Sequence, residues 1–249
     1  MLNINKLILL FVTILFTNEL KAQSLIAGIP SADITPVGKL MFTHESQVNA
    51  WKYDKVKWNS FNFLCYGVQK NLEFTVSFSN LSNSPVSHEC LGIGFKKVFD
   101  IPIHLPESKF IVGQNVLFGV EKKPTVGGWS YAMYSLRTPK LKTRLTAGVS
   151  FGSAELFGYD TLTSQENGIA KKSVIRRNPF SFMAGLEQPI IEDKFYIIAD
   201  WFSGRHDLSA LITGVQINFK HLVLITGYKF PNFEKPKSGS IICELMYEF

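Results

Sequence analysis

Ser240-Ile241-Ile242-Cys243-Glu244-Leu245-Met246-Tyr247-Glu248-Phe249 is the stretch that decides the fold. One register of it holds Ile241, Cys243, Leu245, Tyr247 and Phe249, and the other holds Ile242, Glu244, Met246 and Glu248. This period of two indicates a β-strand with one apolar face and one face that carries carboxylates. Taken alone, the stretch fits a half-buried edge strand and a strand exposed to lipid equally well, so the rest of the chain must decide.

The same period recurs along most of the chain. Residues 72–79 alternate Leu, Phe, Val and Phe with Glu, Thr, Ser and Ser, and residues 142–153 and 208–219 follow the same pattern. Soluble strands usually run to about five or six residues, so longer strands favour a bilayer-spanning role. The pattern predicts about twelve strands, at 38–48, 58–69, 72–80, 88–98, 109–120, 128–137, 142–153, 179–188, 194–203, 208–219, 221–230 and 240–249.

The connections between these strands are sorted by length. After even-numbered strands they are mostly short, at 70–71, 138–141, 189–193 and 220, although 99–108 is longer. After odd-numbered strands they are longer, at 49–57, 81–87, 121–127, 154–178, 204–207 and 231–239. Short periplasmic turns and longer extracellular loops are typical of membrane barrels, whereas a soluble β-sandwich has no reason to sort its loops in this way.

Composition narrows the class of protein further. Among 249 residues only 18% are charged and 13% are aromatic, yet no apolar run beyond the N-terminus is long enough for a transmembrane helix. The net charge of +6 is spread over predicted loops, so nucleic acid is not an expected partner. Three cysteines are too few for a disulfide scaffold, and a Cys65–Cys90 pair is not expected. The sequence predicts no metal site and no cofactor.

The N-terminus has the order of an export signal. Lys6 precedes the ten apolar residues 7–16, and a more polar stretch ends at Lys-Ala-Gln. Residues 1–23 are therefore predicted to be a signal peptide, cleaved after Ala22 or Gln23. Residues 24–37 contain Pro30 and Pro36 and predict an irregular lead-in, either periplasmic or tucked into the mouth of a barrel.

Together the export signal, the alternating strands with connections sorted by length, and the aromatic C-terminus resemble the outer-membrane β-barrels of Gram-negative bacteria. The resemblance is to a porin-like class and not to a single named family. The resemblance implies an all-β, antiparallel, up-and-down transmembrane barrel over residues 38–249 in the lipid of the cell outer membrane. It also implies that Leu245, Tyr247 and Phe249 form the signal recognised by the barrel-insertion machinery. Closure is expected because an open sheet edge is not tolerated in hydrocarbon.

The register opposite the apolar one predicts the lining of the lumen. We expect a narrow, porin-like channel for passive passage of small solutes, with no enzymatic activity and no catalytic residues. The alternative is an interior filled with salt-bridged side chains that conducts nothing. The predicted lumen-facing ionisable residues are Glu73, Arg144, Glu187, Asp200, Glu244 and Glu248.

Aromatic residues near the strand ends predict interfacial girdles, where a ring with a polar tip is favoured. These residues are Trp58, Trp129, Tyr131, Trp201, Tyr228, Tyr247 and Phe249.

His44-Glu45-Ser46 predicts a second function to weigh against the channel. His44 and Ser46 share the lipid-facing register, and Asn62 on the next strand could orient the histidine. The arrangement resembles outer-membrane phospholipases and lipid A deacylases, which would make the chain a lipid hydrolase. It departs from the phospholipases in the residues after the serine, here Gln47-Val48. The third possibility is a structural or surface-binding barrel that acts through its extracellular loops.

Overall fold

The structure is a computed structural model. It describes residues 25–49, 56–80, 89–102, 107–120, 126–153, 159–166, 169–176, 179–204, 206, 208–232 and 239–249. The predicted signal peptide, residues 1–23, lies outside the described residues. Within those residues, no helix has the length and apolar character needed to cross a membrane.

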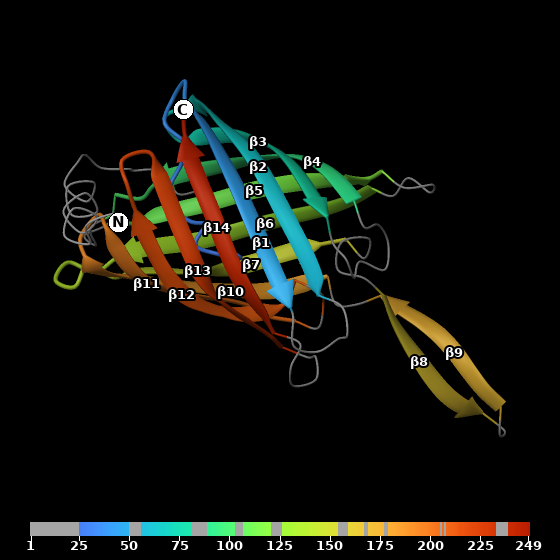
Figure 1. Cartoon of the computed structure of the whole chain (residues 1–249). Coiled ribbons are helices and arrows are strands. Elements are labelled where there is room, and N and C mark those ends of the chain that lie inside the picture. The colour runs from blue at the N-terminus through green and yellow to red at the C-terminus, as the bar shows by residue number, and fades with distance from the viewer. Residues whose placement is uncertain are drawn as a thin grey trace, which may run out of the picture.

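Twelve strands form a closed, wholly antiparallel barrel in the order β1-β14-β13-β12-β11-β10-β7-β6-β5-β4-β3-β2 (Figure 1). Each of the twelve predicted ranges overlaps one barrel strand, with ends that differ by no more than three residues, so the predicted fold class is confirmed. Numbered along the chain, with β8 and β9 outside the barrel, the strands are β1 (Leu40–Asn49), β2 (Lys57–Gln69), β3 (Leu72–Asn80), β4 (Glu89–Asp100), β5 (Lys109–Gly119), β6 (Val126–Arg137), β7 (Arg144–Gly152), β8 (Tyr159–Glu166), β9 (Ile169–Arg176), β10 (Phe180–Ile191), β11 (Phe195–Phe202), β12 (Ala210–Asn218), β13 (Leu222–Pro231) and β14 (Ser240–Glu248).

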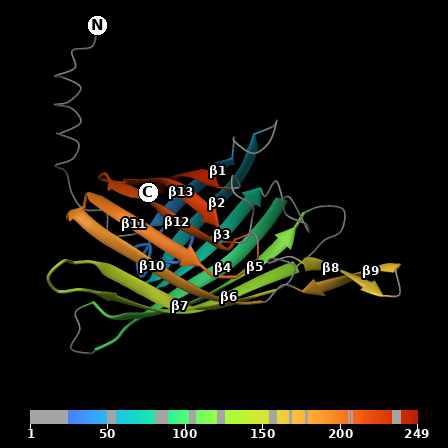
Figure 2. The ribbon, with the colours of Figure 1, turned by 90° about the horizontal axis from the view of Figure 1, so that it is seen from below.

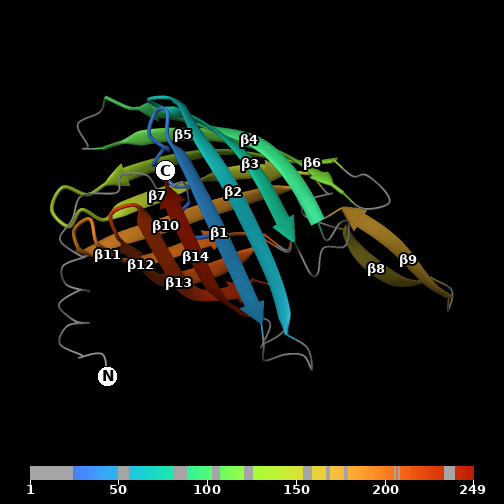
Figure 3. The same ribbon diagram turned by 45° about the horizontal axis from the view of Figure 1, so that its top comes forward.

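The barrel closes between the first and last strands, β1 and β14, which lie side by side in Figure 3. Their register runs from Met41 opposite Glu248 to Val48 opposite Ile241. On its other side β1 pairs with β2, from Leu40 opposite Tyr66 to Asn49 opposite Lys57. The ring therefore has no open edge, which is the condition for a sheet in hydrocarbon.

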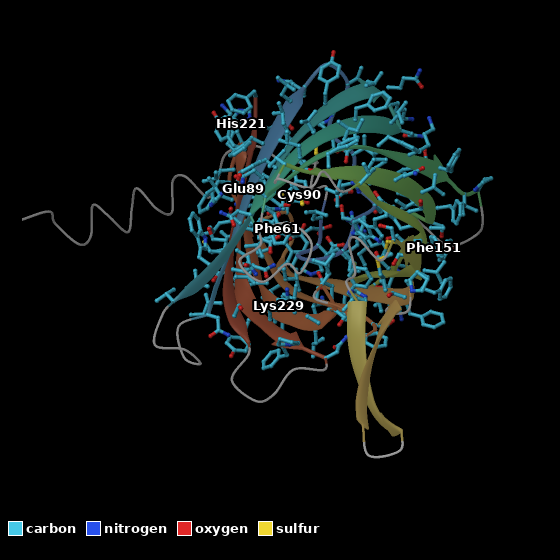
Figure 4. All side chains as sticks on the ribbon, turned by 90° about the vertical axis from the view of Figure 1, so that its right-hand side faces the viewer. Phe61, Glu89, Cys90, Phe151, His221 and Lys229 are labelled. Carbon is cyan, nitrogen blue, oxygen red and sulfur yellow. The ribbon has the colours of Figure 1, made fainter. Side chains whose placement is uncertain are left out.

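The two faces of the wall differ sharply in chemistry. On β14, Ile241, Leu245 and Tyr247 are 43%, 39% and 40% exposed, whereas Ile242 and Glu244 are fully buried. Phe151 likewise points away from the ring in Figure 4, a view in which Phe61 and Lys229 lie within it. An apolar outer surface of this extent is suited to contact with lipid. The exposed apolar side chains elsewhere include Phe74, Val76, Phe78, Leu91, Ile93, Phe180, Phe182, Ile197, Trp201 and Leu211.

Strands β8 and β9 form a separate two-stranded sheet within the predicted 154–178 loop and project beyond one end of the barrel (Figure 1). The sequence did not predict this hairpin. Its residues, YDTLTSQE and IAKKSVIR, lack the regular apolar alternation that marks the barrel strands, because neither strand belongs to the wall. The hairpin lengthens the connection between β7 and β10, which are neighbours in the ring.

Residues 25–35 are buried or half-buried inside the barrel, where they are drawn in blue in Figure 2. Ile26 and Ile29 are fully buried, and both side chains approach Gly185 on β10. Gly38, with φ of 77°, then turns the chain into β1, a conformation that glycine adopts without strain. We call residues 25–37 the plug. The prediction for residues 24–37 left a periplasmic position and a position in the barrel open, and the described part takes the second.

Candidate functional site

The plug is held by ionisable residues of the wall. Arg144 on β7 donates from Nη1 to Oδ2 of Asp33 at 2.7 Å and to Oε1 of Glu187 on β10 at 3.4 Å. Burial raises the pKa of the Asp33 carboxyl, but the Arg144 guanidinium, together with Lys109 and Lys96, outweighs burial, so the net shift of the pKa is downward from 3.8. A lowered pKa means that the ion pair stabilises the fold fully above pH 3.8, and that this contribution is lost as the pH falls through the lowered value.

Two further wall carboxylates bind the plug through its backbone. Glu73 on β3 accepts from Thr35 N at 2.8 Å and from Thr35 Oγ1 at 2.9 Å, while its other oxygen lies 3.2 Å from Lys96 Nζ. Asp200 on β11 accepts from the backbone N–H groups of Ala27 and Gly28 at 3.0 and 2.7 Å. The plug is thus tied to strands on opposite parts of the ring.

The remaining predicted lumen residues, Glu244 and Glu248, lie on the inward register of β14. Glu244 is fully buried and faces Glu45 across the β1–β14 pair, whereas Glu248 is half-buried at the end of the strand. Glu45 accepts a hydrogen bond from Gln47, whose own oxygen accepts from Lys229 Nζ at 3.0 Å. Glu73, Arg144 and Asp200 therefore hold the plug directly, and Glu187 pairs with Arg144, whereas the channel hypothesis expected all four to line open water.

Between the plug and the wall, the interior of the barrel holds a cavity of about 140 Å³. Leu25 and Pro30 of the plug border it, and Phe61, Trp129 and Tyr131 line its wall. Trp129 stacks on Phe202 with ring centroids 5.8 Å apart. The predicted girdle role of Trp129 and Tyr131 is wrong, because both rings face the interior of the barrel. Where the apolar and polar residues of a strand alternate weakly, the sequence does not show which face an aromatic residue near the strand end occupies.

His44, Ser46 and Asn62 meet on the outer surface of the wall. His44 and Ser46 are two residues apart on β1, and β2 places Asn62 directly opposite His44. His44 Nδ1 lies 2.8 Å from Asn62 Oδ1, and His44 Nε2 lies 3.0 Å from Ser46 Oγ. The structure therefore brings all three predicted residues within hydrogen-bonding distance.

The hydrogen bonds define the direction of proton donation. Asn62 Nδ2 donates to the Phe78 carbonyl at 3.3 Å, which turns its Oδ1 toward His44. In the neutral imidazole of His44, Nδ1 then donates to Asn62 and Nε2 is left to accept from the Ser46 hydroxyl. This is the arrangement of an orienting group, a general base and a nucleophile.

The surroundings of this triad are apolar and face lipid. On β1, Phe42 precedes it, and on β2 Leu64 follows Asn62; both are exposed on the outer wall. Across β14, Leu245 lies opposite His44. A substrate with acyl chains could reach Ser46 from the bilayer without entering the barrel.

A closed antiparallel ring with an apolar outer wall decides the class of the protein. The fold is that of an outer-membrane β-barrel. No protein-family model matches the chain, and no curated protein matches it. In the part of the chain that the structure describes, no group of three or more His, Cys, Asp or Glu side chains is arranged to hold a metal ion.

Three solved barrels illustrate the range of structural likeness. The translocator domain of the autotransporter NalP from Neisseria meningitidis is 9% identical over 85% of this chain and 87% of its own, with a TM-score of 0.46. The β domain of the Bordetella autotransporter BrkA is 12% identical over 85% and 99%, with a TM-score of 0.34. Ail, the attachment invasion locus protein of Yersinia pestis, is 12% identical over 86% and 100%, with a TM-score of 0.22. Because none reaches 0.5, the class assignment rests on the barrel itself.

Two elements of these sites were missed from sequence. Asp33 lies in a segment with no periodic pattern, so nothing local connects it to Arg144, which is 111 residues away. Trp58 was predicted only as a girdle residue, yet its Nε1 donates to Ser46 Oγ at 3.2 Å. The register of β1 on β2, with Val48 opposite Trp58, was the one piece of information that could have placed the indole beside the serine.

Proposed function

We propose that this protein is an outer-membrane hydrolase that cleaves acyl ester bonds of membrane lipids at Ser46. The observation that carries the proposal is the continuous hydrogen-bonded chain from Ser46 through His44 to Asn62 on a lipid-facing wall. Ser46 is the nucleophile, His44 the general base and Asn62 the residue that holds His44 in the required tautomer. This function takes the place of the predicted channel as the main hypothesis because the interior is occupied by the plug.

The reaction follows the usual course of acyl transfer. Ser46 Oγ bonds to the ester carbonyl carbon while its proton passes to His44 Nε2, and the carbonyl π electrons move to oxygen. Collapse of this intermediate breaks the bond to the lipid alcohol, which takes the proton from His44. Water, deprotonated by His44, then attacks the acyl carbon. The bond from that carbon to Ser46 Oγ breaks, the fatty acid leaves, and His44 returns the proton to Oγ.

Fatty-acid release from the folded barrel tests the proposal. In mixed micelles that contain phospholipid or lipopolysaccharide, the wild-type chain should release fatty acid, and Ser46→Ala should reduce the rate by at least about 1000-fold. Ser60→Ala is the matched control, because Ser60 lies directly opposite Ser46 on the same face and should leave the rate within about twofold of wild type. Retained activity in Ser46→Ala, or no release by a folded wild-type barrel from either lipid, would contradict the proposal.

A second candidate is passage of small solutes when the plug leaves the lumen, and the internal cavity favours it. The intact chain should give no current steps in a planar bilayer. The double variant Asp33→Ala, Thr35→Ala removes the ion pair with Arg144 and the hydroxyl bond to Glu73, so the weakened plug should leave and produce discrete steps, whereas Asp193→Ala, in an exposed turn, should stay silent. A silent double variant that is folded and inserted would rule out passage by this route.

A further inference from the structure

The proposed reaction has a requirement that the backbone around Ser46 does not meet. Attack on an ester puts a negative charge on the carbonyl oxygen, and enzymes stabilise it with hydrogen-bond donors fixed in advance. Ser46 lies within a strand paired on both sides, opposite Cys243 of β14 and Ser60 of β2. Backbone N–H groups of such a strand are used in the ladder. The donor must therefore come from a side chain, a solvent molecule or the substrate.

The side chains nearest the serine differ in what they can still donate. The Nδ1–H of His44 is directed to Asn62, and the Nδ2 group of Asn62 donates to the Phe78 carbonyl. Trp58 differs from both, because its indole N–H already points at Ser46 Oγ, 3.2 Å away. An indole N–H can only donate, so its partner at this site must be an acceptor.

We propose that Trp58 is the oxyanion donor of this site, an inference that rests on the proposed hydrolase function. In the free protein its N–H occupies a lone pair of Ser46 Oγ, which leaves the hydroxyl proton for His44. After Oγ bonds to the carbonyl carbon, the oxyanion is attached to that same carbon, so a small rotation of the exposed indole transfers its hydrogen bond from Oγ to the oxyanion. No proton leaves Trp58 at any step.

The placement of Trp58 suits this role physically. It lies opposite Val48 near the C-terminal end of β1, one diagonal step from Ser46 on the outer face. The flanking surface is apolar, and in such surroundings a fixed donor stabilises charge more than it would in water. Trp58 therefore supplies at the membrane surface what a backbone amide supplies in hydrolases whose nucleophile lies on a turn.

Replacement of Trp58 by Phe tests the inference, because it removes the N–H and keeps an aromatic ring. We expect kcat for fatty-acid release to fall about 100-fold or more with KM nearly unchanged, since the lost bond forms only in the transition state. Trp201→Phe is the control: Trp201 is also exposed on the outer wall, and its Nε1 donates to Asn232 Oδ1 at 3.2 Å, on β11 away from the triad.

The outcomes separate the two proposals. Wild-type kcat in Trp58→Phe, beside an inactive Ser46→Ala, would overturn the oxyanion role and leave the hydrolase intact. A raised KM with unchanged kcat would also overturn it, because Trp58 would then anchor lipid. An active Ser46→Ala would remove the hydrolase function and this inference with it. Heat-dependent migration of each variant on a denaturing gel establishes that the barrel is folded.

Discussion

Replacement of Arg144 by Met is expected to lower the free energy of unfolding by about 3–5 kcal/mol. Arg144 is buried and lies between the carboxylates of Asp33 and Glu187. Removing the guanidinium leaves two buried negative charges close together with their main cationic partner gone, and this is more costly than the loss of the attraction alone. The plug should also be released, because Asp33 is one of its anchors.

Urea unfolding of the barrel in detergent, followed by tryptophan fluorescence, measures the loss. Arg137→Met is the matched control, since Arg137 pairs with Glu107 at 2.9 Å but Glu107 is half exposed to solvent. Exposed pairs contribute about 0–1 kcal/mol, so this variant should unfold close to wild type. Equal losses in the two variants would show that the Arg144 network does not hold the plug.

A Leu245→Arg substitution is expected to impair assembly of the barrel. Leu245 is at the middle of the outward register of β14, the strand that closes the ring against β1. An arginine on the lipid face near the bilayer midplane costs about 2–4 kcal/mol. It also alters the stretch that resembles the signal for the insertion machinery, so both insertion and stability should suffer.

The folded fraction in isolated outer membranes, judged by heat-dependent gel migration, measures this effect. Val126→Arg provides the comparison, because Val126 is an exposed residue at the start of β6, where an arginine can reach the interface and should cost about 0–1 kcal/mol. Normal levels of folded Leu245→Arg would contradict the assignment of the outward register to lipid.

The filled interior and the outer-wall triad are consistent with one another. A barrel that acts on lipid at its outer surface needs a rigid wall but no open lumen. The plug and its ion pairs supply contacts across the interior, from Glu73 on β3 to Asp200 on β11. Rigid support matters because a base and a nucleophile must be held within a fraction of an ångström to react efficiently.

Individual residues show which strand faces and which neighbours could be predicted from the sequence. The alternation around Glu73 and Leu245 placed both on the correct face, because the face of a strand residue follows from its neighbours in sequence. The same reasoning failed for Trp129, whose strand alternates weakly. The sequence placed Asn62 on the strand next to that of His44, since consecutive strands of a meander pair with each other, but their direct pairing needed the register of β1 on β2.

By itself the sequence determined that this protein is a barrel of about twelve antiparallel strands with an apolar outer wall. That information is local, because a period of two and the lengths of the connections are properties of short segments. Only the tertiary structure decided what fills the lumen and which donor reaches Ser46. The plug is irregular and binds side chains that lie far along the chain, and the Trp58–Ser46 contact depends on strand register, so neither leaves a pattern in the order of the residues.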